Sequence, residues 1–403
     1  MNRRITTFYW MQLLVLAVVH FLIDMFASML PAILPAIRDE FSLSLSRGGL
    51  VLVALLMTSN GIQPLIGHMR ADKRRPLFLH LGLILAVSIC LLGALPRGSS
   101  AFSLIILLAV VSGCGIAIVH PEGLRAVHRL KRLPPAVSTA VFMAGGFLGF
   151  ASGGAVSALL VSRFGLQGLY PLALCPVIGI VMVIFLRLRL AVERKVRNKN
   201  EARTEENRLP FWLIMTMAMP AAVSTTVLAN LLPTVLNELG FELTFGGYST
   251  TMFGLGGAVG SFVWANIAGK KGELKCSIAA LFLVVPFIVI YLIFINNRSA
   301  IWLLFGAGFC AIAAYILMIT LSRHATGLSL GQRMGFMVGG TWALANIVFL
   351  ALLPVAEQFG TNVILKFVPL GYLCSGLLGI LVMSKLRNPA LTKSAAPQTT
   401  AEN

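Results

Sequence analysis

Long apolar runs, each about as long as a helix needs to cross a lipid bilayer, recur along almost the whole sequence. A spanning helix takes about 20 mainly apolar residues. The 403-residue chain contains twelve such runs. They lie at roughly 9–37, 44–66, 76–95, 101–122, 136–162, 169–187, 209–237, 248–268, 276–295, 300–320, 335–356 and 363–384. The sequence therefore predicts an all-α membrane protein with twelve transmembrane helices.

The charged residues gather between these runs. Only 11% of residues are charged and 58% are hydrophobic, whereas about a quarter are charged in a typical soluble domain. The net charge is +18, and with the N-terminus inside, 26 of the 32 Lys and Arg residues fall on the inner side. An excess of Lys and Arg marks cytoplasmic loops. We therefore expect a multi-pass protein of the cell inner (cytoplasmic) membrane, with both termini in the cytoplasm and no nucleic-acid partner.

The chain consists of two similar halves. FMAGG at 142–146 recurs as FMVGG at 336–340, and LPAILPAIRDEFSLSL near the end of the first run has a counterpart in LLPTVLNELGFELTF near the end of the seventh. Two copies in the same orientation indicate a parallel duplication, and transporters built in this way bind substrate near the membrane midplane, between halves that rock around the site. The expected segments are a six-helix bundle at 1–186, a cytoplasmic linker at 187–208, a second six-helix bundle at 209–385 and a cytoplasmic tail at 386–403.

The loop after the second run carries a recognisable motif. Its sequence GHMRADKRR, residues 67–75, contains a glycine, then Asp72, then basic residues that include Arg74. This resembles the conserved loop of the major facilitator superfamily, in which the acid and the bases lock the cytoplasmic face. The repeat GKKGELK at 269–275 keeps the glycine and the bases but has no aspartate. The resemblance implies the major facilitator fold.

The fifth run carries glycines at a regular spacing, in the sequence GGFLGFASGG from Gly145 through Gly149 and Gly153 to Gly154. Small residues at this spacing make a flat helix face that packs closely against another helix. The pattern is similar to the antiporter motif of drug exporters, with Phe150 in place of a proline. Helix packing alone and a role specific to antiport both remain open.

A narrower resemblance comes from HFLID at 20–24, VHPEGLR at 119–125 and the same glycines. Together these segments resemble the fosmidomycin-resistance branch of the superfamily. The resemblance implies proton-driven export of small drugs or metabolites.

Asp24 lies near the middle of the first run, with His20 one helical turn before it. A charged side chain at that depth costs at least about 2.5–3.5 kcal/mol, and such groups usually face a cavity. Residues four apart share a helix face, so His20 and Asp24 are candidates for a proton-coupling pair. Two alternatives remain open: a neutral pair that joins helices, and a transition-metal site, for which two ligands from one helix are too few.

The fourth run ends in His120, Pro121 and Glu122. Proline removes a backbone hydrogen bond and should kink or end the helix there. Glu122 is then expected near the cytoplasmic edge, where it can pair with Arg125. We interpret His120, Glu122 and Arg125, together with Asp72 and Arg74, as a candidate gate. An ordinary interfacial acid is the alternative for Glu122.

Other polar residues inside the runs are candidates for lining a substrate cavity, although single residues of this kind also bond between helices. They are Asn60, Gln63, Thr226, Asn230, Asn266, Trp342 and Asn346.

The function expected from these features is secondary active transport, with proton-coupled export of a small organic molecule ahead of metabolite import by the same fold. No HExxH motif occurs in the sequence, so a sensor or intramembrane enzyme is less favoured. The expected partners are a small-molecule substrate, protons and the lipid bilayer. Neither a cofactor nor a metal is expected, and the fold can work as a monomer.

Overall fold

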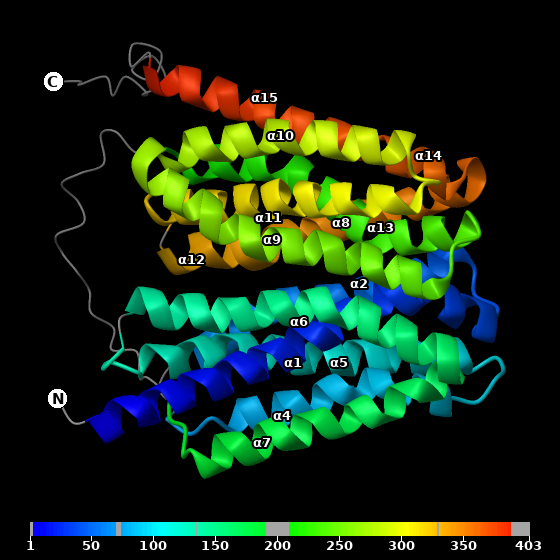
Figure 1. The fold of residues 1–403 in the computed structure, drawn as a ribbon, viewed down its shortest axis with the longest axis horizontal. Coiled ribbons are helices and arrows are strands. Elements are labelled where there is room, and N and C mark those ends of the chain that lie inside the picture. Colours follow the sequence, from blue (N-terminus) through cyan, green and yellow to red (C-terminus); the bar gives the residue numbers. More distant parts are fainter. Residues whose placement is uncertain (1–2, 70–73, 134, 191–208, 329, 388–403) are drawn as a thin grey trace, which may run out of the picture.

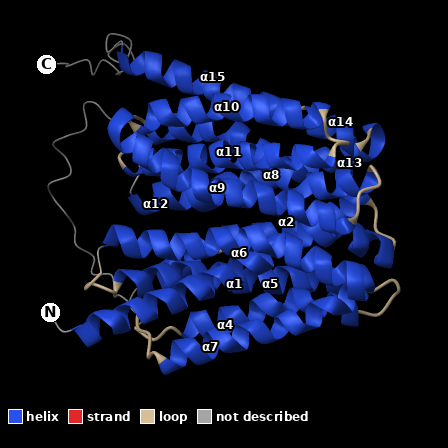
Figure 2. Ribbon diagram, viewed as in Figure 1, coloured by secondary structure: helices blue, strands red, loops and turns tan. Residues whose placement is uncertain are grey.

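The computed structural model describes residues 3–69, 74–133, 135–190, 209–328 and 330–387, and they are almost entirely helical. Figures 1 and 2 show the arrangement. The α-helices are α1 (Arg3–Phe41), α2 (Leu45–Gly61), α3 (Gln63–Met69), α4 (Leu77–Ala86), α5 (Ala101–His128), α6 (Pro135–Phe164), α7 (Cys175–Phe185), α8 (Phe211–Glu238), α9 (Leu243–Lys271), α10 (Glu273–Ile293), α11 (Ile301–Arg323), α12 (Leu330–Gly335), α13 (Thr341–Phe359), α14 (Thr361–Lys366) and α15 (Val368–Arg387). Shorter 3₁₀ segments are η1 (Val87–Ala94), η2 (Gly165–Leu174) and η4 (Arg298–Ala300), and η5 (Phe336–Gly340) is a π-helix.

Ten helical segments among the described residues are long and apolar enough to cross a membrane, so the expected number of twelve is not confirmed. Three expected runs account for the difference. The run at 44–66 is divided into α2, with 17 residues, and α3. The runs at 136–162 and 169–187 belong to one continuous helical stretch, Val137–Phe185, because η2 links α6 to α7 with no extended loop between them.

The fourth run extends further than its proline predicts. Helix α5 continues through Pro121 and ends at His128, so of the two expected outcomes, a kink or an end at the proline, the end is wrong. Prolines are tolerated inside membrane helices because neighbouring helices and local backbone adjustments satisfy the freed carbonyl. The extension places His120 eight residues, or about 12 Å along the axis, before the helix end.

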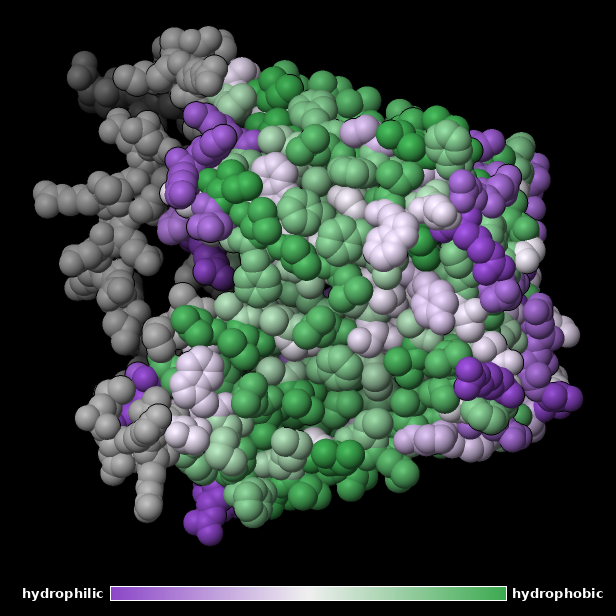
Figure 3. Space-filling view, viewed as in Figure 1, coloured by the Kyte–Doolittle hydropathy of each residue, from purple (hydrophilic) through white to green (hydrophobic). Residues whose placement is uncertain are grey.

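The beginning of α1 and the end of α15 lie at the same end of the molecule, on the left in Figure 1. We call this the terminal end and the opposite one, where α1 reaches Phe41, the far end. Apolar residues form a broad band around the middle of the visible surface, and hydrophilic residues gather at the two ends (Figure 3). This distribution is the one expected for helices that cross a bilayer, with the polar ends in water.

Helices α1–α7 pack mainly on one another, as do α8–α15, and the two groups meet where α6 contacts α9 and α2 contacts α13. Small residues allow the first of these contacts to be close. The Thr251 hydroxyl donates to the carbonyl of Ala151 at 2.5 Å, and the backbones of Gly154 and Gly247 face each other.

The regularly spaced glycines of α6 lie against α1. A Cβ atom added to Gly145, Gly149 or Gly153 would collide with the carbonyl oxygens of Ala17, Phe21 and Met25, respectively. Because these are backbone atoms, they cannot move aside as a flexible side chain could. The glycines therefore allow α6 to approach the part of α1 that carries His20 and Asp24.

Candidate functional site

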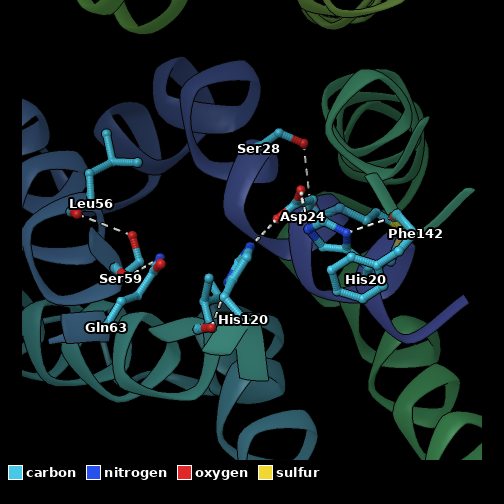
Figure 4. A network of polar contacts seen from close by, with 10 residues as sticks. His20, Asp24, Ser28, Leu56, Ser59, Gln63, His120 and Phe142 are labelled. Atoms are coloured by element: carbon cyan, nitrogen blue, oxygen red, sulfur yellow. Dashed lines mark hydrogen bonds and ion pairs between the residues drawn. The ribbon is translucent and has the colours of Figure 1, made fainter. Parts of the chain in front are cut away.

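A carboxylate lies between two imidazole rings inside the first group of helices (Figure 4). Asp24 Oδ2 is 3.3 Å from Nε2 of His20 on the same helix. Asp24 Oδ1 is 3.0 Å from Nε2 of His120 on α5. The two histidine rings meet edge to face, with centroids 5.1 Å apart. We call His20, Asp24 and His120 the polar trio.

The other nitrogen of each histidine ring is held by a backbone carbonyl. His20 Nδ1 lies 2.8 Å from the oxygen of Phe142 on α6, and His120 Nδ1 lies 2.9 Å from the oxygen of Ile116. A carbonyl only accepts hydrogen bonds, so both Nδ1 atoms carry the hydrogen and donate. These contacts fix the ring orientations and direct both Nε2 atoms at Asp24.

The three residues of the polar trio differ in how far they are buried. His20 is only 3% exposed, and its ring stacks on Phe142 with centroids 4.2 Å apart. The side chains of Asp24 and His120 are 21% and 23% exposed. One face of the carboxylate is therefore sealed by packing, and the other can be reached by a small ion or molecule.

The sequence identified His20 and Asp24 as a pair but assigned His120 to a gate at the end of its helix. The structure brings His120 to Asp24 instead. The displacement follows from the length of α5, which continues past Pro121 to His128. A separation of four residues within one helix reveals an i, i+4 pair. A contact between α1 and α5, in contrast, requires knowledge of how the helices pack.

Glu122 lies inside the protein and is completely buried. Its Oε2 accepts a hydrogen bond of 3.0 Å from the backbone amide of Phe78, in the first turn of α4. The first amides of a helix have no partners within the helix, and they attract negative charge. Glu122 therefore satisfies and stabilises the beginning of α4.

The other candidate gate residues lie in different surroundings. Arg125 is buried, at 5% exposure, and Arg74 is exposed. The carbonyl of Arg74 accepts from the amide of Leu190 at 2.9 Å. Asp72 lies outside the described residues. A gating role for this group stays a prediction.

The polar residues expected to line a cavity do not form one cluster. The amides of Asn60 and Gln63 donate to carbonyls of their own helical turn, those of Leu56 and Ser59. Thr226 and Asn230 are buried in α8, at 4% exposure each, and Asn266 is exposed.

Asn346 and Trp342 lie on α13. The Asn346 amide donates to the carbonyl of Trp342 at 2.8 Å, while its Oδ1 is buried without a hydrogen-bond partner. The Trp342 ring packs on Tyr315 with centroids 4.8 Å apart. The cavity role of all seven residues stays a prediction.

Two polar contacts join the two groups of helices at the far end, and the sequence reading missed both. Arg38 Nη1 on α1 lies 3.6 Å from Glu238 Oε1 on α8. The two carboxylate oxygens of Glu357 on α13 accept from the amide and the hydroxyl of Ser46 on α2, at 2.7 and 2.8 Å. We call these the far-end contacts. Residues at helix ends give no sequence signal of their partners until the helices are arranged in space.

Comparisons with known proteins agree with this architecture. The sequence model of the Major Facilitator Superfamily matches residues 16–350. An uncharacterised MFS-type transporter of Bacillus subtilis (strain 168), YfnC, is 23% identical over 399 residues, covering 93% of this chain and 94% of the relative. The fosmidomycin resistance protein of Escherichia coli (strain K12) is 25% identical over 191 residues, covering 47% of this chain and 46% of the relative.

Among solved structures, a bacterial homologue of the human lysosomal transporter Spinster, in an inward-facing and unoccupied conformation, superposes with a TM-score of 0.62 and 12% identity, covering 94% of this chain and 96% of that one. The occupied inward-facing form gives the same TM-score with 13% identity and the same coverage. At this identity, the likeness concerns the fold alone. Because the family model spans most of the sequence, the chain belongs to the Major Facilitator Superfamily.

Proposed function

We propose that the protein is a proton-coupled secondary active transporter that exports a small organic molecule by alternating access. Membership of a transporter superfamily supports the transport itself. The partial similarity to a fosmidomycin resistance protein supports export of a drug-like molecule or metabolite. The observation that carries proton coupling is Asp24, held between His20 and His120 at 3.3 and 3.0 Å.

The polar trio has the parts that a proton exchange site needs. A carboxylate inside a membrane protein is costly when charged, and such groups commonly serve as proton relays. The two Nε2 atoms offer alternative positions for the proton beside Asp24 Oδ1 and Oδ2. Gain or loss of a proton changes the contact between α1 and α5, and these two helices belong to the half that we propose moves as a unit.

In the proposed cycle the bundles 1–186 and 209–385 rock against each other around a substrate site between them. The far end must open in one state, so the contacts of Arg38 with Glu238 and of Ser46 with Glu357 must break. We place the far end on the outside of the cell inner membrane and both termini in the cytoplasm, as the distribution of Lys and Arg favours.

The experiment that tests this function uses the purified full-length protein in liposomes that contain a pH-sensitive dye. Fosmidomycin and a panel of small organic molecules are added in turn, with and without an imposed pH gradient. A transported compound should move protons in the opposite direction to itself. Movement of protons and compound in the same direction would replace export by symport, and the absence of proton movement with any transported compound would reject proton coupling.

A further inference from the structure

We propose that His20, Asp24 and His120 also bind a divalent transition-metal cation such as Zn²⁺ or Co²⁺. Each residue offers one ligand atom, and the three atoms lie within 4.8 Å of one another. The sequence offered only two ligands on one helix. The fold adds a third from α5 and so completes a donor set of two imidazole nitrogens and one carboxylate oxygen.

Hydrogen-bond accounting shows that the polar trio must hold either protons or a metal cation at its two contacts. Because both Nδ1 atoms donate to carbonyls, the Nε2 atom of a neutral ring presents a lone pair. The oxygens of an ionised carboxylate also only accept. Two contacts at 3.3 and 3.0 Å would then join acceptor to acceptor. One proton satisfies one of these contacts, while a proton on each Nε2 atom, or a metal cation between the three residues, satisfies both.

The hydrogen bonds that the two Nδ1 atoms make are those typical of histidines that bind a metal. A histidine that binds a metal usually donates its other ring N–H to a carbonyl or carboxylate, which fixes the tautomer and the ring orientation. Here the carbonyls of Phe142 and Ile116 provide that support at 2.8 and 2.9 Å. Both Nε2 atoms are therefore in the form and orientation that a metal requires.

The distances between the ligand atoms also fit. Metal bonds to histidine nitrogen and carboxylate oxygen of about 2.0–2.2 Å place neighbouring tetrahedral ligands about 3.3–3.5 Å apart. The His20 Nε2 to Asp24 Oδ2 distance of 3.3 Å has that length, and the His120 contact at 3.0 Å is a few tenths shorter. These two distances reach different oxygens of Asp24, and the three ligand atoms, which lie within 4.8 Å of one another, must approach one another to hold one ion.

Gly146 leaves space beside two of the ligand atoms. A Cβ atom at this position on α6 would lie 2.5 Å from Asp24 Oδ2 and 2.6 Å from His20 Nε2. The absence of a side chain at Gly146 therefore keeps open a position close to bonding distance from both atoms. This observation is independent of the hydrogen-bond accounting.

The ligand types select the class of cation. Imidazole suits Zn²⁺, Co²⁺, Ni²⁺ and Cu²⁺, whereas Mg²⁺ and Ca²⁺ prefer all-oxygen sites. Three protein ligands leave one coordination position for water or another small ligand, and the exposed fifth of Asp24 and His120 gives that position access. In transport, the metal and the coupling protons compete for the same atoms, so bound metal blocks the cycle. The expected block of the transport cycle rests on the proposed function, whereas the binding of the metal does not.

The test uses purified full-length protein, with its affinity tag removed and metals stripped by EDTA, titrated with Co²⁺ and followed by visible absorption. Saturable ligand-field bands at one ion per chain are expected, and Zn²⁺ should abolish them. His120→Gln and Asp24→Asn should each weaken Co²⁺ binding by more than the ~10–100-fold that is typical of losing an outer-shell partner. His80→Gln, on α4 and outside the polar trio, should change it less than about twofold by the same scale.

Wild-type protein without saturable Co²⁺ bands, or equal binding by wild type and by both trio variants, overturns the metal site. Thermal unfolding of each variant, measured with EDTA, shows whether the loss reflects misfolding. If a trio variant unfolds, Gly146→Ala serves in its place, because its added methyl group would lie against Asp24 Oδ2 and His20 Nε2 and should also abolish the bands; retained bands would contradict the site.

Transport assays separate this inference from the proposed function. If the protein carries out proton-coupled transport in an assay with EDTA, but shows no Co²⁺ bands in the separate metal titration, the metal site alone is rejected. Co²⁺ bands in a protein whose transport ignores the pH gradient would reject the proton coupling alone.

Discussion

His120 Nε2 lies 3.0 Å from Asp24 Oδ1, although 96 positions separate the two residues in the sequence. This contact joins α5 to α1 (Figure 4). It also changes the interpretation of the sequence, because His120 becomes part of the site that includes Asp24 instead of part of an end-of-helix gate.

The His120→Gln variant is expected to lower pH-gradient-driven transport by about tenfold or more. A hydrogen bond to a charged group is worth about 1.5–3 kcal/mol, and about 1.4 kcal/mol corresponds to a factor of ten. Initial rates in proteoliposomes measure the effect. His80→Gln, outside the polar trio, is the matched control and should transport as wild type does. Equal rates for His120→Gln and wild type would remove His120 from the coupling site.

The Glu357→Gln variant is expected to favour states in which the far end is open, because it weakens the link between Ser46 and α13. Partly exposed polar contacts are worth about 0.2–1 kcal/mol, so the ratio of open to closed molecules should rise by no more than about fivefold. Distances between spin labels at Asp39 and Leu239, in a variant without native cysteines, report this ratio.

Glu242→Gln is the control for that experiment. Glu242 pairs with Arg298 at 3.1 Å, also at the far end but within the second group of helices. Its loss should leave the distance distribution unchanged. If both variants shift the distribution equally, the contact between Ser46 and Glu357 has no special part in closing the far end.

The Gly149→Ala variant is expected to lower the melting temperature. Its new methyl group would collide with the backbone carbonyl of Phe21, and overpacking of this kind typically costs about 1–3 kcal/mol. Gly269→Ala is the control because a Cβ atom there meets no atom within 4 Å. A melting temperature that falls for Gly269→Ala but not for Gly149→Ala would refute the close approach of α6 and α1.

Substitution of Glu122 distinguishes a structural role from a gating role. Glu122→Leu removes this acceptor from the part-buried Phe78 amide, at a cost of up to about 1–3 kcal/mol, and should speed hydrogen exchange at the beginning of α4. Glu122→Gln keeps an acceptor oxygen and should have a smaller effect. If a Glu122 variant instead changes the solvent accessibility of the terminal end while hydrogen exchange in α4 stays normal, the gating role is supported.

The features that sequence analysis found are those that depend on local spacing. Apolar length predicts which segments span the membrane, the i, i+4 rule pairs His20 with Asp24, and the spacing of four between Gly145, Gly149 and Gly153 predicts a close helix contact without naming α1 as the partner. Each of these patterns lies within a single helix and is governed by the helical repeat.

The features that it missed depend on packing or on where a helix ends. Pro121 predicted a kink or a helix end, but α5 continues to His128, so His120 was placed too near the edge. The partners of Arg38 and Glu357 lie on other helices, at sequence separations of 200 and 311. The runs at 136–162 and 169–187 are two helices, α6 and α7, and what the apolar lengths missed is that the 3₁₀ segment η2 joins them without an extended loop.

The measurement that tests the central claim most directly uses the Asp24→Asn variant reconstituted in liposomes. It compares the accumulation of substrate driven by a pH gradient with the exchange of labelled for unlabelled substrate in the absence of a gradient. Asp39→Asn, an exposed aspartate on the same helix, is the control. The account predicts that Asp24→Asn loses gradient-driven accumulation but keeps exchange, while Asp39→Asn keeps both. Undiminished gradient-driven accumulation by Asp24→Asn would contradict it.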